Sequence, residues 1–342
     1  MSANANTREE SQKNVRLQIV IVAVGAALLI AKFFAYHLTR SNTVLTDALE
    51  SIVNVVAGAL GLYSLIVAAM PKDENHPYGH GKIEFISAGV EGTLIIIAGV
   101  LIVIKSVESL FFPQALAQLD MGIYITGAAG AVNYVLGFWA MQQGKRSNSL
   151  ALVASGKHLI SDTYSTIGLV IGLLLIWATN WLWLDSATAI LFGFIIAFTG
   201  YHIIKESIAG IMDEVDYSLV SRVIEVLQAN RQPNWIDVHN LRIIKYGGAL
   251  HIDCHLTVPR FFNVVDAHNE VDALELVFES QIQPEIELFI HVDACVPDSC
   301  RLCPRHACPV RDANFEALED WTLQNIMQNR KHGLEEQQKT MI

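Results

Sequence analysis

Six long apolar segments fill the first two-thirds of this 342-residue chain. A helix needs about 20 predominantly apolar residues to cross the hydrocarbon of a bilayer, and each segment approaches or exceeds that length. Because a helix satisfies its backbone polar groups internally in lipid, we expect six transmembrane helices within residues 16–212. The apolar segments are 17–36, 44–70, 85–112, 121–141, 151–181 and 184–204.

Basic residues mark one side of this predicted membrane domain. They precede the first segment and occupy alternate loops, whereas the opposite loops offer only Arg40. By the positive-inside rule, residues 1–15 form a cytoplasmic N-terminal segment and the C-terminus is also cytoplasmic. We therefore expect a multi-pass protein of the cell (inner or plasma) membrane, with the lipid bilayer among its partners. The basic residues are Arg8, Lys13, Arg16, Lys72, Lys82, Lys145, Arg146, Lys157 and Lys205.

Two pairs of polar side chains interrupt the apolar segments at four-residue spacing: Glu50 with Asn54, and His158 with Asp162. Residues four apart share one face of a helix. Ionisable groups at bilayer depth are costly unless they face a partner or a wet cavity, so they indicate function. Two such helices side by side would offer two carboxylates, an imidazole and an amide oxygen to one divalent cation. The sequence therefore predicts a membrane carrier for a transition-metal ion. Asp47 either adds a carboxylate or caps a neighbouring helix.

Residues 213–293 have the pattern of a small soluble domain. Helical spacing and strand alternation follow one another in the order αββαβ, which predicts an α+β domain with one helix layer on one sheet. From residue 213 onward the chain has 21 Asp and Glu against 11 Lys and Arg, a net charge of −10 that argues against a nucleic-acid partner. The segments are 217–231, 238–246, 250–258, 264–280 and 286–292.

Potential metal ligands recur in this soluble domain. A lone histidine is usually a satisfied polar residue, but five potential ligands within 55 residues also fit a metal site. Cys254 alternates out of phase with His255, so we expect its side chain in the core. The five potential ligands are His239, His255, His268, His291 and Asp293.

Four clustered cysteines distinguish the tail, residues 294–342. Disulfides are disfavoured on the cytoplasmic side, so Cys295, Cys300, Cys303 and Cys308 indicate thiolate ligands for Zn²⁺. An iron–sulfur cluster and reduced or regulatory thiols are the alternatives. We also expect residues 312–330 to form a short helix that docks on the soluble domain. Its apolar residues are Phe315, Leu318, Trp321 and Ile326.

The loop after the second apolar segment carries the most specific pattern. Residues 71–84 read Pro-Lys-Asp-Glu-Asn-His-Pro-Tyr-Gly-His-Gly-Lys-Ile-Glu. This resembles the Asp-x-x-His-Pro-x-Gly-His-Gly-x-x-Glu loop of the cation diffusion facilitator family. Other similar segments extend the resemblance over residues 15–293: they are 45–51, 158–162, 239–242 and 290–293.

The resemblance implies a homodimer of six-helix subunits, each with a cytoplasmic αββαβ domain of metallochaperone or ferredoxin-like fold. It implies export of Zn²⁺, or of Fe²⁺, Mn²⁺, Co²⁺ or Cd²⁺, against inward proton flow, with Zn²⁺ also as a structural or regulatory ion. Position by position, the transport site corresponds to Glu50, Asn54, His158 and Asp162. The loop site corresponds to Asp73, His76 and His80, and a cytoplasmic site at the dimer interface to His239, His255, His268, His291 and Asp293.

The second apolar segment departs from the family pattern, which has His or Asp followed four residues later by Asp. Glu50 and Asn54 stand there instead. With Asp162 the formal ligand charge is still −2, so attraction for a divalent ion is retained. An amide oxygen and a longer carboxylate favour Mn²⁺ or Fe²⁺ more than imidazole does. Zn²⁺ stays the first expectation because of the family resemblance alone.

Two other functions compete with a carrier. An intramembrane metal-dependent hydrolase would use similar ligands, but its typical His-Glu-x-x-His motif is absent from the sequence. A membrane-tethered metal sensor whose transport is impaired by Asn54 would keep the cytoplasmic histidines. We therefore expect a transporter and not an enzyme. Glu91, inside the third apolar segment, either lines the proton or ion path or is hydrogen-bonded to a neighbour.

Overall fold

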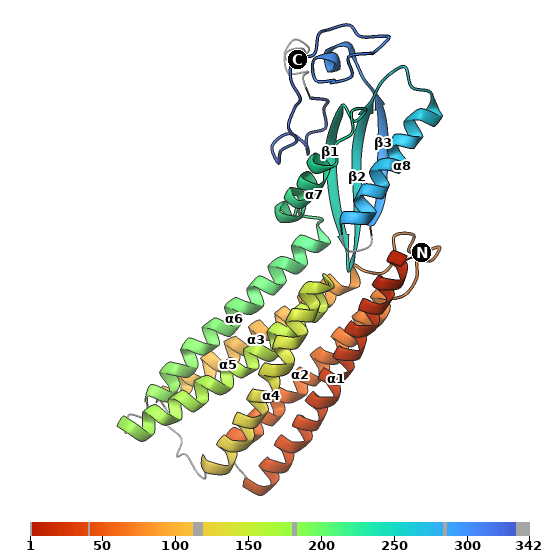
Figure 1. The fold of residues 1–342 in the computed structure, drawn as a ribbon. Coiled ribbons are helices and arrows are strands. Elements are labelled where there is room, and N and C mark those ends of the chain that lie inside the picture. Colours follow the sequence, from red (N-terminus) through yellow and green to blue (C-terminus); the bar gives the residue numbers. More distant parts are fainter. Residues whose placement is uncertain (1, 40–41, 112–118, 180–182, 283–285, 333–342) are drawn as a thin grey trace. The chain divides into compact units, whose positions relative to one another are not determined.

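The computed structural model describes residues 2–39, 42–111, 119–179, 183–282 and 286–332 (Figure 1). Ala5–Met212 form one compact unit, and Asp213–Ile342 form the main part of a second. Each unit has its own buried apolar clusters. Those of the first lie between long helices, and the largest cluster of the second lies between helices and a sheet.

The first unit contains six long helices among the described residues, which run side by side in Figure 1. By length and composition, three apolar stretches in the described residues can cross a membrane: Glu10–Phe34, Ile83–Phe111 and Ala189–Ile211. A shorter apolar stretch, Asn54–Ala68, lies in the second helix. The helices are α1 (Ser2–Thr39), α2 (Asn42–Ala68), α3 (Ile83–Phe111), α4 (Leu119–Arg146), α5 (Leu150–Thr179) and α6 (Trp183–Ile211).

Glycines bring α3 and α6 close together. A Cβ on Gly92 would lie 3.0 Å from the carbonyl oxygen of Gly200, and a Cβ on Gly200 would lie 2.7 Å from that of Gly92. Any larger residue at either position would therefore push the helices apart. Small residues are the usual means of close helix contact in membranes, where lipid removes the hydrophobic drive for association.

The second unit has the predicted αββαβ order. Strands β1 and β2 pair antiparallel, and β2 and β3 pair parallel, so the sheet order is β1-β2-β3. Asp216 accepts hydrogen bonds from the backbone of Ser218 and Leu219 at the start of α7, and Asn263 and Asp266 form a capping box on α8. The elements are α7 (Tyr217–Ala229), β1 (Asp237–Tyr246), β2 (Ala249–Val258), α8 (Val264–Gln281) and β3 (Ile286–Ala294).

Alternation along β2 separates the core of this unit from its polar face. Ile252, Cys254 and Leu256 are buried in the core with residues of α7 and α8. The intervening residues, His255 among them, lie on the opposite side of the pleat. The expectation that Cys254 belongs to the core is therefore confirmed, and His255 lies on the face of the sheet away from the helices.

The tail does not form the helix expected over residues 312–330; coil and turns occupy this range. Its backbone pairs elsewhere, because the carbonyls of Ile326 and Gln328 accept hydrogen bonds from the amides of Leu241 and Asn240. These amides lie where the β1–β2 register shifts at a bulge. Trp321 and Ile326 are nevertheless buried in the core of the second unit, so the expected docking occurs without a helix.

Candidate metal centres

The side chain of Asn54 joins α2 to α5 at the predicted transport site. Its amide nitrogen donates to a carboxylate oxygen of Asp162, and its amide oxygen lies 2.9 Å from Nε2 of His158. His158 is buried, with 6% of its surface exposed. Three of the four predicted ligands are therefore in direct contact. Glu50 and Asp47 lie on α2, but their side chains are outside the described residues.

This arrangement follows from helical spacing. His158 and Asp162 are four residues apart on α5 and present imidazole and carboxylate on one face, while α2 supplies an amide between them. An amide both donates and accepts, so Asn54 matches two chemically different partners at once. Imidazole nitrogen and carboxylate or amide oxygen are all ligands for divalent transition metals.

A buried polar network lies one helical turn from this site. Ser155, three residues before His158, donates to Glu91 Oε1 at 2.8 Å and accepts from Gln18 Nε2 at 3.1 Å. Glu91 is only 1% exposed, which agrees with a hydrogen-bonded neighbour. A Cβ on Gly61 would lie 2.9 Å from both Gln18 Nε2 and Glu91 Oε1, so glycine is needed here. Sequence reasoning missed Gln18 and Ser155, because neither is ionisable.

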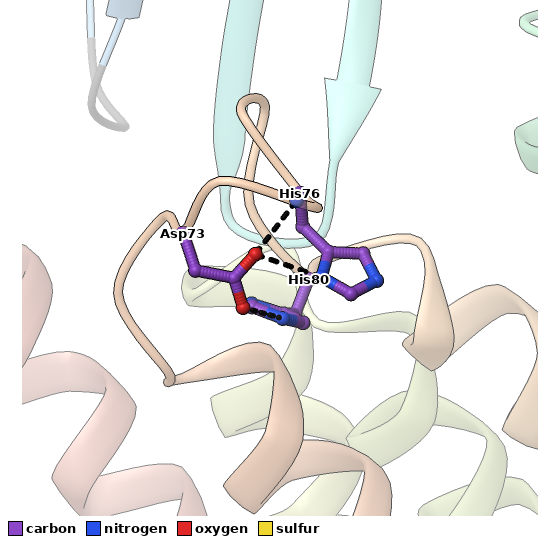
Figure 2. Close-up of side chains that lie close together, drawn as sticks. All are labelled: Asp73, His76 and His80. Atoms are coloured by element: carbon purple, nitrogen blue, oxygen red, sulfur yellow. Dashed lines mark hydrogen bonds and ion pairs between the residues drawn. The ribbon is translucent and has the colours of Figure 1, made fainter.

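The loop between α2 and α3 gathers Asp73, His76 and His80 around one point (Figure 2). One atom of each residue lies within 4.8 Å of the others. Asp73 Oδ1 is 3.0 Å from His76 Nδ1, and Asp73 Oδ2 is 3.3 Å from His80 Nε2. The turn itself positions the carboxylate, since Asp73 Oδ1 also accepts from the backbone amides of Asn75 and His76.

Asp73 is held ionised in this turn. Desolvation raises the pKa of its carboxyl, but hydrogen bonds from the backbone and imidazole of His76 outweigh that effect, so the pKa is lowered. Two imidazoles and one carboxylate are three ligands of the kind found in zinc sites. The three residues predicted for the loop site therefore lie where one ion can reach all of them.

Strand register assembles a second cluster on the sheet. His239 on β1 is opposite His255 on β2, and His255 is opposite His291 on β3. Asp293 Oδ2 lies 3.0 Å from His255 Nδ1 and 3.5 Å from His239 Nε2. One atom each of His239, His255 and Asp293 lies within 4.8 Å of the others. His291 stands at the edge of the cluster, 3.9 Å from Asp293 Oδ1.

His268 is the member of the predicted cytoplasmic site that this subunit does not bring to the cluster. It lies on α8, its side chain is 72% exposed, and its nearest ionic partner is Asp272 at 3.7 Å. The helices and the histidine ladder use opposite faces of the sheet, which accounts for the separation.

The tail contributes residues around the sheet cluster that the sequence did not indicate. Lys331 Nζ lies 3.4 Å from Asp293 Oδ1, and His332 hydrogen-bonds the buried Asp237, which also faces His239 Nδ1 at 3.3 Å. Burial raises the pKa of Asp237, but the imidazole of His239 and the hydrogen bonds from His332 outweigh it and hold the pKa well below its usual range. Asp237 therefore lies beside His239 on the side where carboxylates usually contact metal-binding histidines.

Comparison with known proteins gives two domain matches and several relatives that match over most of their length. Residues 18–212 match the cation efflux transmembrane domain, and residues 215–295 match the cytoplasmic domain of cation efflux proteins. An uncharacterized transporter of Synechocystis sp., sll1263, is 34% identical over 77% of this chain and 85% of its own.

Two Bacillus subtilis proteins are more distant. The manganese efflux system protein MneS is 26% identical over 78% of this chain and 91% of its own. A cadmium, cobalt and zinc/H⁺-K⁺ antiporter is 23% identical over 87% of this chain and 95% of its own.

Proposed function

Because this chain belongs to the cation diffusion facilitator family, we propose that it exports a divalent transition-metal ion from the cytoplasm in exchange for protons. Members of the family are cation efflux transporters and not enzymes, which sets aside an intramembrane hydrolase. The contact of Asn54 with both His158 and Asp162 is the observation that most supports the proposal, because it concentrates ligand atoms between two apolar helices.

Proton exchange follows from the chemistry of the ligands. A histidine binds metal only through a ring nitrogen that has lost its proton, so an ion at His158 Nε2 competes with protonation. The same ion would replace the hydrogen bonds that now link Asn54 to the two side chains. The same atoms would therefore bind metal when the site opens to the cytoplasm and bind protons when it opens to the opposite side of the membrane.

Zn²⁺ is our first choice of ion, as the family resemblance and the imidazole of His158 favour it. The oxygens of Glu50 and Asn54 favour Mn²⁺ or Fe²⁺ relatively more. One relative is named for manganese and another for cadmium, cobalt and zinc, so this family of sites accommodates both kinds of ion.

The proposed assembly is a homodimer with six membrane spans per subunit and both termini in the cytoplasm. The match to the cytoplasmic domain of the family supports dimerisation, and the loop basic residues support the orientation. The sheet cluster would bind cytoplasmic metal in this assembly, and the transport site between α2 and α5 would carry it across.

Purified protein in proteoliposomes tests the proposal. Zn²⁺, Mn²⁺, Fe²⁺, Co²⁺ and Cd²⁺ are offered in turn while metal uptake and internal pH are recorded. We expect uptake of at least one ion, with a proton flux in the opposite direction and weaker metal affinity as pH falls. Metal binding without uptake of any ion would instead identify a membrane metal sensor.

A further inference from the structure

Four cysteines of the tail surround one small cavity. Cys295, Cys300, Cys303 and Cys308 all line it, together with Ile236 and Pro259. The first three are buried, and all four are free thiols. The cavity has a volume of about 10 Å³, which is room for a single water-sized atom.

Two arginines fix the backbone that carries these thiols. The guanidinium of Arg311 donates to the carbonyls of Cys300 and Cys303, at 3.0 and 2.8 Å. Arg260 donates to the carbonyl of Val310 at 2.8 Å and to the carboxylate of Asp312. The turns between the cysteines are therefore held by polar contacts around the cavity, with only a small apolar cluster of Ile236, Cys295 and Cys303 beneath them.

Backbone amides point at two of the sulfurs. The amide of Arg260 lies 3.3 Å from Cys295 Sγ, and that of Asp312 lies 3.5 Å from Cys300 Sγ. Hydrogen bonds of this kind stabilise thiolates and orient ligating groups. Four thiolates with one Zn²⁺ carry a net charge of −2; the guanidinium of Arg311 would offset part of it, whereas that of Arg260 is already paired with Asp312.

We propose that Cys295, Cys300, Cys303 and Cys308 bind one Zn²⁺ ion in a closed structural site. Four thiolates complete the tetrahedral coordination of zinc and leave no position for a substrate. The small cavity suits one ion better than a multi-iron cluster. This site lies outside the transport path, so the proposal does not depend on which ion the protein carries.

Zinc binding should tighten the tail. In the loop and sheet clusters, the ligand atoms lie within 4.8 Å of one another. Among the described residues, the sulfurs of the four cysteines do not form a group as compact as these. Zn–S bonds of about 2.3 Å would pull the sulfurs inward. The same tail places Trp321 and Ile326 in the core of the second unit and Lys331 beside Asp293. The ion would therefore fix a segment that contributes to the core of this soluble unit.

The test is a count of zinc ions in the full-length protein by native mass spectrometry. Wild type is compared with the double variant Cys300→Ser, Cys303→Ser and with Cys254→Ala, whose cysteine lies in the core and away from the cavity. We expect the double variant to lose one zinc per subunit and Cys254→Ala to lose none. Cobalt added in place of zinc should give the intense visible absorption of tetrahedral thiolate-bound Co²⁺ in wild type and Cys254→Ala only.

Metal uptake by proteoliposomes checks that the double variant is folded, because the proposed site is separate from transport. Equal zinc counts in wild type and the double variant would overturn the proposal. So would iron and acid-labile sulfide in stoichiometric amounts at these cysteines, because they would assign an iron–sulfur cluster to the same thiols.

Discussion

The helix pair α2–α5 and the sheet β1–β3 both gather imidazole and carboxylate, but they do so by different means. On the sheet, ladder hydrogen bonds fix His239, His255 and His291 opposite one another. Between the helices, the amide of Asn54 is the described link to His158 and Asp162. A sheet register shifts only by breaking many backbone bonds, whereas two helices can move by exchanging a few side-chain contacts. The sheet is therefore suited to hold an ion and the helix pair to bind and release one.

The two sites also differ in the ionic contacts around them. Asp293 on the sheet is contacted by His255 and Lys331, and these contacts lower its pKa although burial raises it. Asp237 and His332 brace the cluster from behind. At the helix pair, the neighbouring network of Gln18, Ser155 and Glu91 leaves Gln18 Oε1 and Glu91 Oε2 without partners among the described residues. In the sheet cluster, the buried ring nitrogens His239 Nδ1 and His332 Nε2 also have no hydrogen-bond partner among the described residues, so the two sites differ mainly in the ionic contacts of Asp293.

The largest effect should come from the helix pair. His158→Ala removes one ligand from a site of about four, so metal flux should fall by more than the roughly 10- to 100-fold loss typical of an outer-shell partner. Flux into proteoliposomes measures this. Thr166→Ala is the matched control, because its hydroxyl donates to the backbone carbonyl of Asp162 one turn away and not to a predicted ligand atom. Retained flux in His158→Ala would show that the ion passes elsewhere.

A charge change at Asn54 should alter selectivity without stopping transport. Asn54→Asp raises the formal ligand charge from −2 to −3 when Glu50 and Asp162 are ionised, and it removes the amide donor to Asp162. We expect the order of preference among Zn²⁺, Mn²⁺ and Fe²⁺ to change in competition flux assays. The same order in variant and wild type would contradict a role of position 54 as a ligand.

Loss of the metal ligands on the sheet should weaken zinc-dependent dimerisation and leave metal flux across the membrane largely intact. Soluble units with a net charge of −10 repel each other, and bound Zn²⁺ should offset that charge and tighten the dimer. His255→Ala with His291→Ala should remove the zinc-dependent part of the dissociation constant, measured by analytical ultracentrifugation of the unit from residue 213 onward. His251→Ala, on the same strand but paired with Glu287, is the control. An unchanged zinc effect in the double variant would exclude this cluster.

The smallest effect concerns the scaffold of the sheet. Asp216 caps α7 and pairs with Lys245 of β1 at 2.5 Å. Burial raises the pKa of Asp216, but Lys245, Ser218 and Leu219 outweigh it and lower the pKa to about 2. Asp216→Ala should destabilise the soluble unit by about 1 kcal/mol in urea unfolding at neutral pH.

The pH dependence of that difference has a definite sign. A depressed carboxyl pKa contributes stability above the unfolded value of 3.8, and this contribution is lost as pH falls through about 2. The difference in the free energy of unfolding between wild type and Asp216→Ala should therefore decrease as pH falls over this range. If this difference in the free energy of unfolding did not change with pH, the charge of Asp216 would not contribute to stability.

Periodicity predicted the parts of these sites that repeat along the chain. Four-residue spacing placed His158 and Asp162 on one face, and period-two alternation put Cys254 in the core and His255 outside it. The predicted order of helices and strands, αββαβ, was confirmed. These features are local, so one segment of sequence contains all the information that they need.

Contacts between distant segments could not be predicted in this way. Asp237 and His332 are 95 residues apart, and no repeating pattern connects them. Gln18 meets Ser155 across 137 residues. The tail was expected to be helical because its apolar residues fall at helical spacing, but the bulge in β1 takes up its carbonyls instead. Tertiary pairing overrode local propensity at that point.

The same substitution made in both sites tests the central distinction most directly. Asp162→Asn and Asp293→Asn each remove one negative charge and keep the shape of the side chain. Zinc flux into proteoliposomes and zinc-dependent dimer affinity are measured for both variants and for wild type. We predict that Asp162→Asn abolishes flux and keeps the zinc effect on the dimer, and that Asp293→Asn keeps flux within a few-fold and loses the zinc effect. Retained flux in Asp162→Asn, or flux abolished by Asp293→Asn alone, would contradict the separation of carrying and holding sites.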